Sequence, residues 1–165
     1  MNELKKTIAH RLVKDSQVVM TELVLPNDTN QLGALLGGKL MHWLDIAAAI
    51  AASRHSGKVC VTASVDEINF LQPIRLGEVV TLRASVNRVF TTSMEVGVQV
   101  TSENLLTGEK KTANTAYFTF VALDGNGRPV PVYQIVPETK DEKRRYKEAL
   151  ERRKQRLLHR QSGAR

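Results

Sequence analysis

The sequence predicts an α+β fold in which an antiparallel sheet wraps around one long central helix. Two observations indicate this arrangement. A helix-length segment beginning near Leu35 and continuing through Ala52 is apolar around almost its whole circumference, which is typical of a buried helix. Four later segments have the composition of strands, with connections short enough for antiparallel hairpins. A single sheet covering a buried helix accounts for both.

The expected elements follow one another in a simple order. Residues 17–25 are apolar and β-branched, as in a strand, and Pro26 opens a polar turn before the helix. Gly57 lies where the helix needs a C-terminal cap. Polar and apolar residues alternate from residue 94 to 101, so one face of the sheet is expected to be apolar and the other polar. The four later strands are expected over residues 59–70, 79–90, 93–104 and 111–123.

The charge of the chain is concentrated at its C-terminus. The net charge is +7, and residues 138–165, with eleven basic and five acidic side chains, contribute six of these positive charges. We therefore separate a domain over residues 1–137 from a basic C-terminal helix and tail. Its thin apolar stripe predicts a solvated helix packing lightly on the body or on a neighbouring subunit, and residues 161–165 are expected to be disordered. A nucleic-acid or membrane arm is the less favoured alternative for this tail, and nucleic acid is an unlikely partner because the basic residues are not interleaved with stacking aromatics.

The composition excludes several classes of protein. Hydrophobic residues make up 42% of the chain and charged residues 25%, as in an ordinary globular domain. The single cysteine, Cys60, allows no internal disulfide or zinc-binding thiol cluster, and the four histidines are scattered, so no metal site is expected. No apolar run is long enough for a signal peptide or a membrane span, so we expect a soluble, cytoplasmic protein without a membrane partner.

One acidic residue stands inside the apolar helix. A carboxylate such as Asp45 is rarely buried unless another group pairs with it or a reaction uses it. At the start of the helix, Gly37 and Gly38 can bring bare backbone N–H groups close to a ligand, where the helix dipole favours the negative charge of an oxyanion. The alternatives are that Asp45 makes a structural hydrogen bond and that the glycines only allow close packing.

The spacing of these residues predicts a dimer. Asp45 follows Gly37 by eight residues, which corresponds to about 12 Å along a helix. One carbonyl group therefore cannot contact both within a single chain. If both act on one substrate, Asp45 must come from a symmetry-related subunit, with paired sites at a twofold interface. The helix is also apolar over more of its surface than one small sheet can cover.

Two neighbouring features have other interpretations, and one further class of enzyme has no support. Asn30, in the loop before the glycines, is suited to orient a water or hold a carbonyl, although a loop asparagine is more often a turn residue. The spacing from Gly33 to Lys39 matches a nucleotide-binding phosphate loop, but Leu40 stands where Ser or Thr would hold magnesium. A serine hydrolase triad has no support because no Gly-x-Ser-x-Gly motif is present.

Several segments together resemble a known family. From about Pro26 to Val132 the chain is similar to the hotdog-fold acyl-CoA thioesterases, in the group containing the brain-type acyl-CoA hydrolase and its short bacterial relatives. The resemblance is carried by PNDTNQLGALLGGKLMHWLD, SVDEINFLQPIRLGEVV, TTSMEVGVQVTSEN and TANTAYFTFVALDGNGRPVPV. It implies hydrolysis of acyl-CoA to a free acid and CoA, in a curved antiparallel sheet wrapped around a central helix. It also implies dimers that assemble into trimers of dimers.

The resemblance also implies roles for individual residues. Asp45 matches the active carboxylate, as general base or nucleophile, and Asn30 matches an asparagine that faces it from the other subunit. Gly38, together with Gly37, would donate backbone N–H groups to the oxyanion. Contacts with CoA are implied for Arg88, Thr92, Ser93 and Met94 at a hairpin and for Arg54 and His55 near the helix end.

The partners implied by the resemblance are acyl-CoA and further copies of the chain. CoA is part of the substrate and product, and no separate cofactor or metal is expected. The preferred acyl length is left open. A different class of function, a non-catalytic acyl-CoA or acyl-carrier binding module using the same tunnel, would fit the same residues without turnover.

Overall fold

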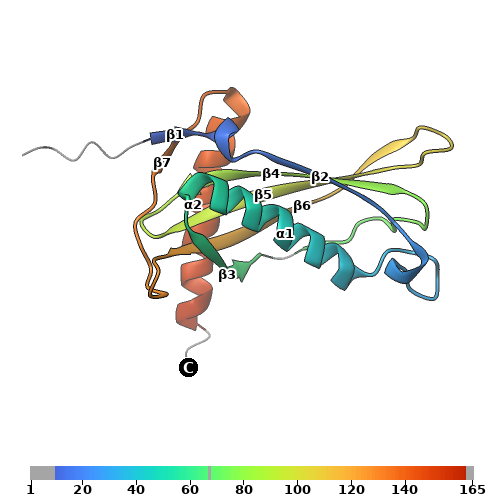
Figure 1. The fold of residues 1–165 in the computed structure, drawn as a ribbon, viewed down its shortest axis with the longest axis horizontal. Helices are drawn as coiled ribbons and strands as arrows, with labels where there is room; N and C mark the ends of the chain where they lie inside the picture. The colour runs from blue at the N-terminus through green and yellow to red at the C-terminus, as the bar shows by residue number, and fades with distance from the viewer. Residues whose placement is uncertain (1–9, 67, 163–165) are drawn as a thin grey trace, which may run out of the picture.

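A five-stranded antiparallel sheet curls around one long helix (Figure 1). The computed structural model describes residues 10–66 and 68–162. The strands lie in the order β2, β4, β5, β6, β3. Their bounds are β2 (Val18–Leu23), β3 (Val59–Val65), β4 (Val79–Val89), β5 (Ser93–Glu103) and β6 (Lys110–Leu123). The α+β architecture is confirmed, and only the strand expected over residues 59–70 is markedly shorter than predicted.

The central helix α1 (Gly37–Ser56) packs on the sheet through small side chains. Its fully buried alanines are Ala47, Ala48, Ala51 and Ala52. Gly57 ends the helix with a φ of 66°, a left-handed conformation that glycine adopts without strain. The other side of α1 is not covered within the chain, because Met41 and Ile50 remain 42% and 37% exposed. A single chain therefore leaves part of the apolar helix exposed, as the sequence predicted.

Two short strands lie outside the main sheet. β1 (His10–Leu12) pairs in parallel with β7 (Gln134–Val136), a contact that the sequence did not predict. Single turns of 3-10 helix form η1 (Val13–Ser16) and η2 (Pro26–Asp28). The second of these is the polar turn expected before α1, and it leads the chain into the loop that carries Asn30.

The second helix, α2 (Lys140–Ser162), crosses the sheet face opposite α1 (Figure 1). The charged C-terminal helix is therefore confirmed. It continues two residues into the segment expected to be disordered, and residues 163–165 of that segment lie outside the described part. Within the described residues, no helix combines the length and the apolar character needed to cross a bilayer.

Buried charge attaches α2 to the sheet. Glu95 on β5 is fully buried, and Arg152 of α2 donates to both of its carboxylate oxygens, at 2.7 Å for Nη2–Oε1. Arg156 lies 3.3 Å from Glu95 and 2.8 Å from Asp66. Asn87 donates to Glu95 from the neighbouring strand at 3.1 Å. The prediction of a lightly packed helix is therefore wrong, because α2 covers part of the polar sheet face.

Candidate active site

Asp45 lies midway along α1 and is only partly buried. Its Oδ1 accepts a hydrogen bond of 2.7 Å from the hydroxyl of Thr62 on the edge strand β3. A single bond of this kind fixes the direction of the carboxylate while leaving its second oxygen open to a ligand. Thr62 was missed in the sequence, where it is one polar residue among several in a strand.

The loop before α1 is organised by the side chain of Asn30. Its Oδ1 accepts hydrogen bonds from the backbone N–H groups of Leu32, at 2.9 Å, and Ala34, at 3.2 Å. Gly33 completes this turn with a φ of 69°. Asn30 is thus a turn residue, as one interpretation held. Because its oxygen faces the loop backbone, the amide NH₂ group is the end left to donate to a substrate oxygen or a water.

Gly37 and Gly38 form the first turn of α1. The N–H groups of a helix's first turn have no acceptor within the helix, and the preceding residue, Leu36, supplies no side-chain cap. A Cβ at Gly38 would meet nothing within 4 Å, and one at Gly37 would only touch Phe70 at 3.5 Å. Close packing therefore does not explain the two glycines. Their N–H groups are instead accessible to an anion at the positive end of the helix dipole.

An ion pair holds the same loop against the start of α1. Lys39 Nζ lies 3.1 Å from Asp28 Oδ1, and the backbone N–H of Leu25 donates to the other Asp28 oxygen at 3.0 Å. The hydrogen bond from Leu25, with the neighbouring Lys39, holds the pKa of Asp28 below its ordinary value. The positive charge of Lys39 is therefore paired with Asp28 in the loop.

Asn30 and Gly37 line one cavity, with a volume of about 360 Å³. Its walls are largely apolar and include Phe70 and Ile74. Asp45 does not line it, because that residue lies about two helical turns further along α1. Gly38, the next residue along the helix, does not line the cavity either. Within one chain the structure thus brings Asn30 and Gly37 together and leaves the carboxylate apart from them.

Two of the residues expected to contact CoA are buried. Met94 and His55 both have an exposure of 0%. Met94 points into the core between sheet and helix, and His55 Nε2 lies 2.7 Å from the backbone oxygen of Tyr133. The expectation that these two side chains contact CoA is therefore corrected.

The other expected CoA contacts do not form one site. Arg88 stacks over the ring of Tyr146, 4.0 Å from its centroid, and donates to that residue's backbone oxygen. Arg54 donates to the backbone of Gln17, at the far end of α1. Ser93 and its neighbour Thr92 are partly exposed at the β4–β5 turn. Arg54 itself is exposed. Ser93 lines a cavity beneath α2.

The burial of His55 predicts a loss of stability in acid. Burial lowers its pKa below the ordinary value of 6.5, so the unfolded chain binds a proton before the folded chain does. The free energy of unfolding should therefore fall as the pH drops below about 6.5. Urea unfolding at pH 7.5 and 5.5 should show a smaller loss for His55→Gln than for the wild type. His159→Gln, at an exposed position, is the control, and equal losses in all three proteins would contradict this prediction.

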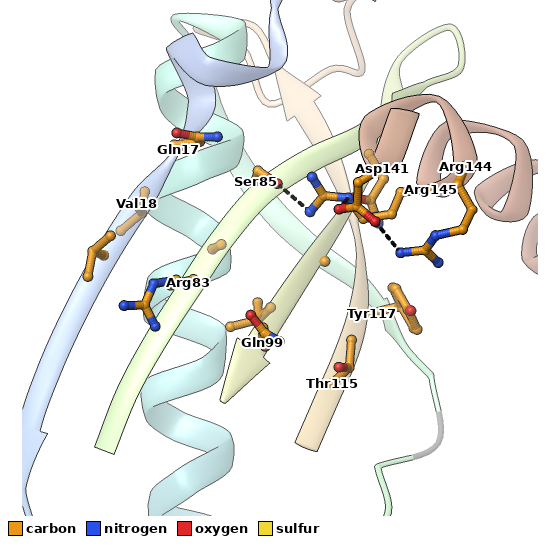
Figure 2. A pocket seen from close by; sticks show the side chains of 15 residues that line it. Gln17, Val18, Arg83, Ser85, Gln99, Thr115, Tyr117, Asp141, Arg144 and Arg145 are labelled. Carbon is orange, nitrogen blue, oxygen red and sulfur yellow. Dashed lines mark hydrogen bonds and ion pairs between the residues drawn. The ribbon is translucent and has the colours of Figure 1, made fainter. Parts of the chain in front are cut away.

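A further cavity, of about 530 Å³, lies on the outer face of the sheet beside the start of α2. Figure 2 shows its polar lining, with Arg83 and Gln99 on the strands and Arg145 of α2 directed towards Ser85. None of the predicted site residues lines this cavity. Because it is on the opposite side of the sheet from α1, it is not part of the candidate active site.

The curled sheet, its central helix and the donor-lined cavity at the helix start define a hotdog-fold thioesterase. Residues 32–109 match the thioesterase superfamily. The chain is 48% identical to the uncharacterized acyl-CoA thioester hydrolase YkhA of Bacillus subtilis, over 93% of this chain and 91% of that protein. It is 44% identical to mouse acyl-coenzyme A thioesterase 11 over 87% of this chain, but spans only 24% of that longer protein. The chain belongs to the acyl-CoA thioester hydrolase family.

Solved structures show the same fold. An apo-hexameric acyl-CoA thioesterase superposes with a TM-score of 0.90 at 40% identity, over 96% of this chain and 100% of that chain. An acyl-CoA hydrolase from Staphylococcus aureus, in complex with butyryl-CoA, CoA and CoA disulfide, gives 0.86 at 37% identity, over 93% and 96%. Alanine variants of that protein replace an asparagine, an aspartate and a threonine. These positions are spaced by 15 and 17 residues, as are Asn30, Asp45 and Thr62.

Proposed function

We propose that this protein hydrolyses acyl-CoA to a carboxylic acid and CoA, at sites shared between two subunits. The observation that carries the proposal is the division of the candidate site within one chain. The cavity at the start of α1 has N–H donors but no acid, whereas Asp45 is held by Thr62 on an uncovered side of the same helix. The three residues altered in the Staphylococcus aureus hydrolase have the same spacing as Asn30, Asp45 and Thr62, which supports the choice of these three as site residues.

The arrangement suits thioester hydrolysis. The N–H groups of Gly37 and Gly38, with the amide of Asn30, would bind the thioester oxygen and stabilise its negative charge in the tetrahedral intermediate. Asp45 of the other subunit would take a proton from a water molecule, whose oxygen bonds to the carbonyl carbon. When the C–S bond breaks, the CoA thiolate accepts that proton. Direct attack by the carboxylate, followed by hydrolysis of the resulting anhydride, is the other route that these groups allow.

The exposed surface supports a twofold dimer. β3 is an edge strand, and an unpaired edge is a ready template for another strand. Val59 and Val61 on this strand are 69% and 43% exposed, and Met41 and Ile50 extend the apolar surface onto α1. Pairing of two β3 edges would extend the sheet and place the two α1 helices side by side. The hexameric relative supports assembly beyond a dimer, and a trimer of dimers is the form that we propose. The single, partly buried cysteine suits a reducing cytoplasm.

The activity is tested by thiol release from short, medium and long acyl-CoAs. We expect release from at least one of them. Binding of acyl-CoA without release from any would identify the non-catalytic binding module instead.

Sharing of the site is tested with mixed oligomers. Asp45→Asn and Asn30→Ala are each expected to be inactive alone, but a mixed dimer of the two variants keeps one intact site. Co-expressed subunits that assort at random should therefore recover about a quarter of the wild-type activity. No recovery, with mixed dimers shown to form, would place both residues in a site within one chain.

A further inference from the structure

The groups that would bind the thioester oxygen come from two separate parts of the chain. Asn30 lies in the loop before α1, whereas Gly37 and Gly38 belong to the helix itself. Residues 31–36 between them form turns and isolated bridges, without a helix or strand of their own. Donors must be held to within about 0.5 Å of their working positions. The contacts that fix the loop against α1 therefore bear directly on the reaction.

Asp28 joins this loop to α1 on both sides of the glycine pair. Its backbone oxygen accepts a hydrogen bond of 2.8 Å from the N–H of Leu36, the residue directly before the pair. Its Oδ1 lies 3.1 Å from Nζ of Lys39, the residue directly after the pair. Because Asp28 is only two residues from Asn30, these contacts set the separation between the Asn30 amide and the N–H groups of the helix.

The ion pair between Asp28 and Lys39 is not an ordinary surface contact. The Asp28 side chain keeps only 9% exposure, and its second oxygen accepts the N–H of Leu25 at 3.0 Å. The Lys39 ammonium also lies over the ring of the buried Trp43, 5.6 Å from its centroid. A cation in the first turn of a helix opposes the helix dipole. Asp28 offsets this charge, and the contacts on both sides of the pair fix its geometry.

We propose that Asp28 and Lys39 are positioning residues for the hydrolysis. Their ion pair holds the amide of Asn30 at the distance from the N–H groups of Gly37 and Gly38 at which one thioester oxygen can contact all of them. Neither Asp28 nor Lys39 lines the cavity that contains Asn30 and Gly37, so both act through the donors and not on the substrate. This inference rests on the proposed function, which assigns those donors to the oxyanion.

Lys39→Met tests the proposal, because it removes the charge while keeping most of the side chain beside Trp43. It should lower kcat for acyl-CoA hydrolysis about tenfold, since a displacement of about 1 Å can cost about 10²-fold. KM should stay within about twofold, because Lys39 does not touch the substrate. Lys39→Arg, which keeps the charge, should retain kcat within about twofold. The double variant Asp28→Asn/Lys39→Met should lose no more than Lys39→Met alone, because both remove the same ion pair.

Lys14→Met is the matched control. It removes the same charge from an exposed ion pair with Glu138, in which the charged atoms are 3.7 Å apart, outside the cavity of the candidate site. It should leave kcat unchanged. A lower melting temperature for Lys39→Met, with the kcat of the control, would show that the pair only stabilises the fold and would overturn the proposal. A loss of kcat that Lys39→Arg shares in full would also overturn it.

Hydrogen exchange separates this inference from the proposed function. If the wild type hydrolyses no acyl-CoA, the proposed function fails by itself. Exchange of the backbone N–H groups of residues 30–38 then tests the ion pair alone, because it reports local opening of the loop. Exchange about tenfold faster in Lys39→Met than in Lys14→Met supports a loop held by the pair, and equal exchange overturns it.

Discussion

Replacing Asp45 with asparagine is expected to lower kcat for acyl-CoA hydrolysis by about 10²–10⁴-fold, the range for loss of a positioned general base. The variant keeps the size of the side chain and its oxygen, so the hydrogen bond from Thr62 can persist. It loses only the ability to take a proton or attack the carbonyl carbon. Because Asp45 is partly exposed, the melting temperature should change little. Thiol release under single-turnover conditions measures the effect.

Two measurements separate the roles of Asp45. Thr62→Val, which removes the hydroxyl that directs the carboxylate, should reduce kcat much less than Asp45→Asn. After a single turnover in ¹⁸O water, label in the Asp45 carboxylate would show attack by Asp45 and hydrolysis of the anhydride at the Asp45 carbon. Activation of water by Asp45 should place the label in the acid product alone. Near-normal turnover by Asp45→Asn would contradict both mechanisms and show that the Thr62 contact is only structural.

The fold was predictable wherever a local pattern determines an element. The alternation between residues 94 and 101 identified β5 and its core face, because the period of two is a property of the strand itself. Glu95 has a polar position in the same pattern, which predicts exposure, yet it is fully buried. Its partner Arg152 follows 57 residues later. A charge pair between distant elements leaves no periodic signal, so the close packing of α2 was not predictable.

The candidate site, like the fold, was predictable only in part. An acid within an apolar helix and a glycine pair at its start are unusual for their positions, and so the sequence singled them out. Thr62 is ordinary for a strand, and only the register shift between Thr62 and Ser64 distinguishes its surroundings. Met94 was selected for its place beside a turn. The alternation that identified the core face of β5 already places Met94 on that face, and its side chain lies in the core.

Replacing Glu95 with alanine is expected to lower the free energy of unfolding by about 3 kcal/mol, the lower end of the range for breaking a buried ion pair. The substitution leaves two arginines beside the sheet without their shared carboxylate. The side chains of Arg152 and Arg156 keep 19% and 17% exposure, so water can solvate them in part and moderate the loss. Urea unfolding at a fixed subunit concentration provides the measurement, because association would otherwise shift the midpoint.

An exposed ion pair on the same helix is the control for Glu95. Glu151 lies 2.9 Å from Lys154, with both side chains 59% exposed, so Glu151→Ala should cost only about 0–1 kcal/mol. A loss for Glu95→Ala no larger than this would mean that water or backbone groups replace the carboxylate. A large loss would show that α2 is held to the sheet by charge.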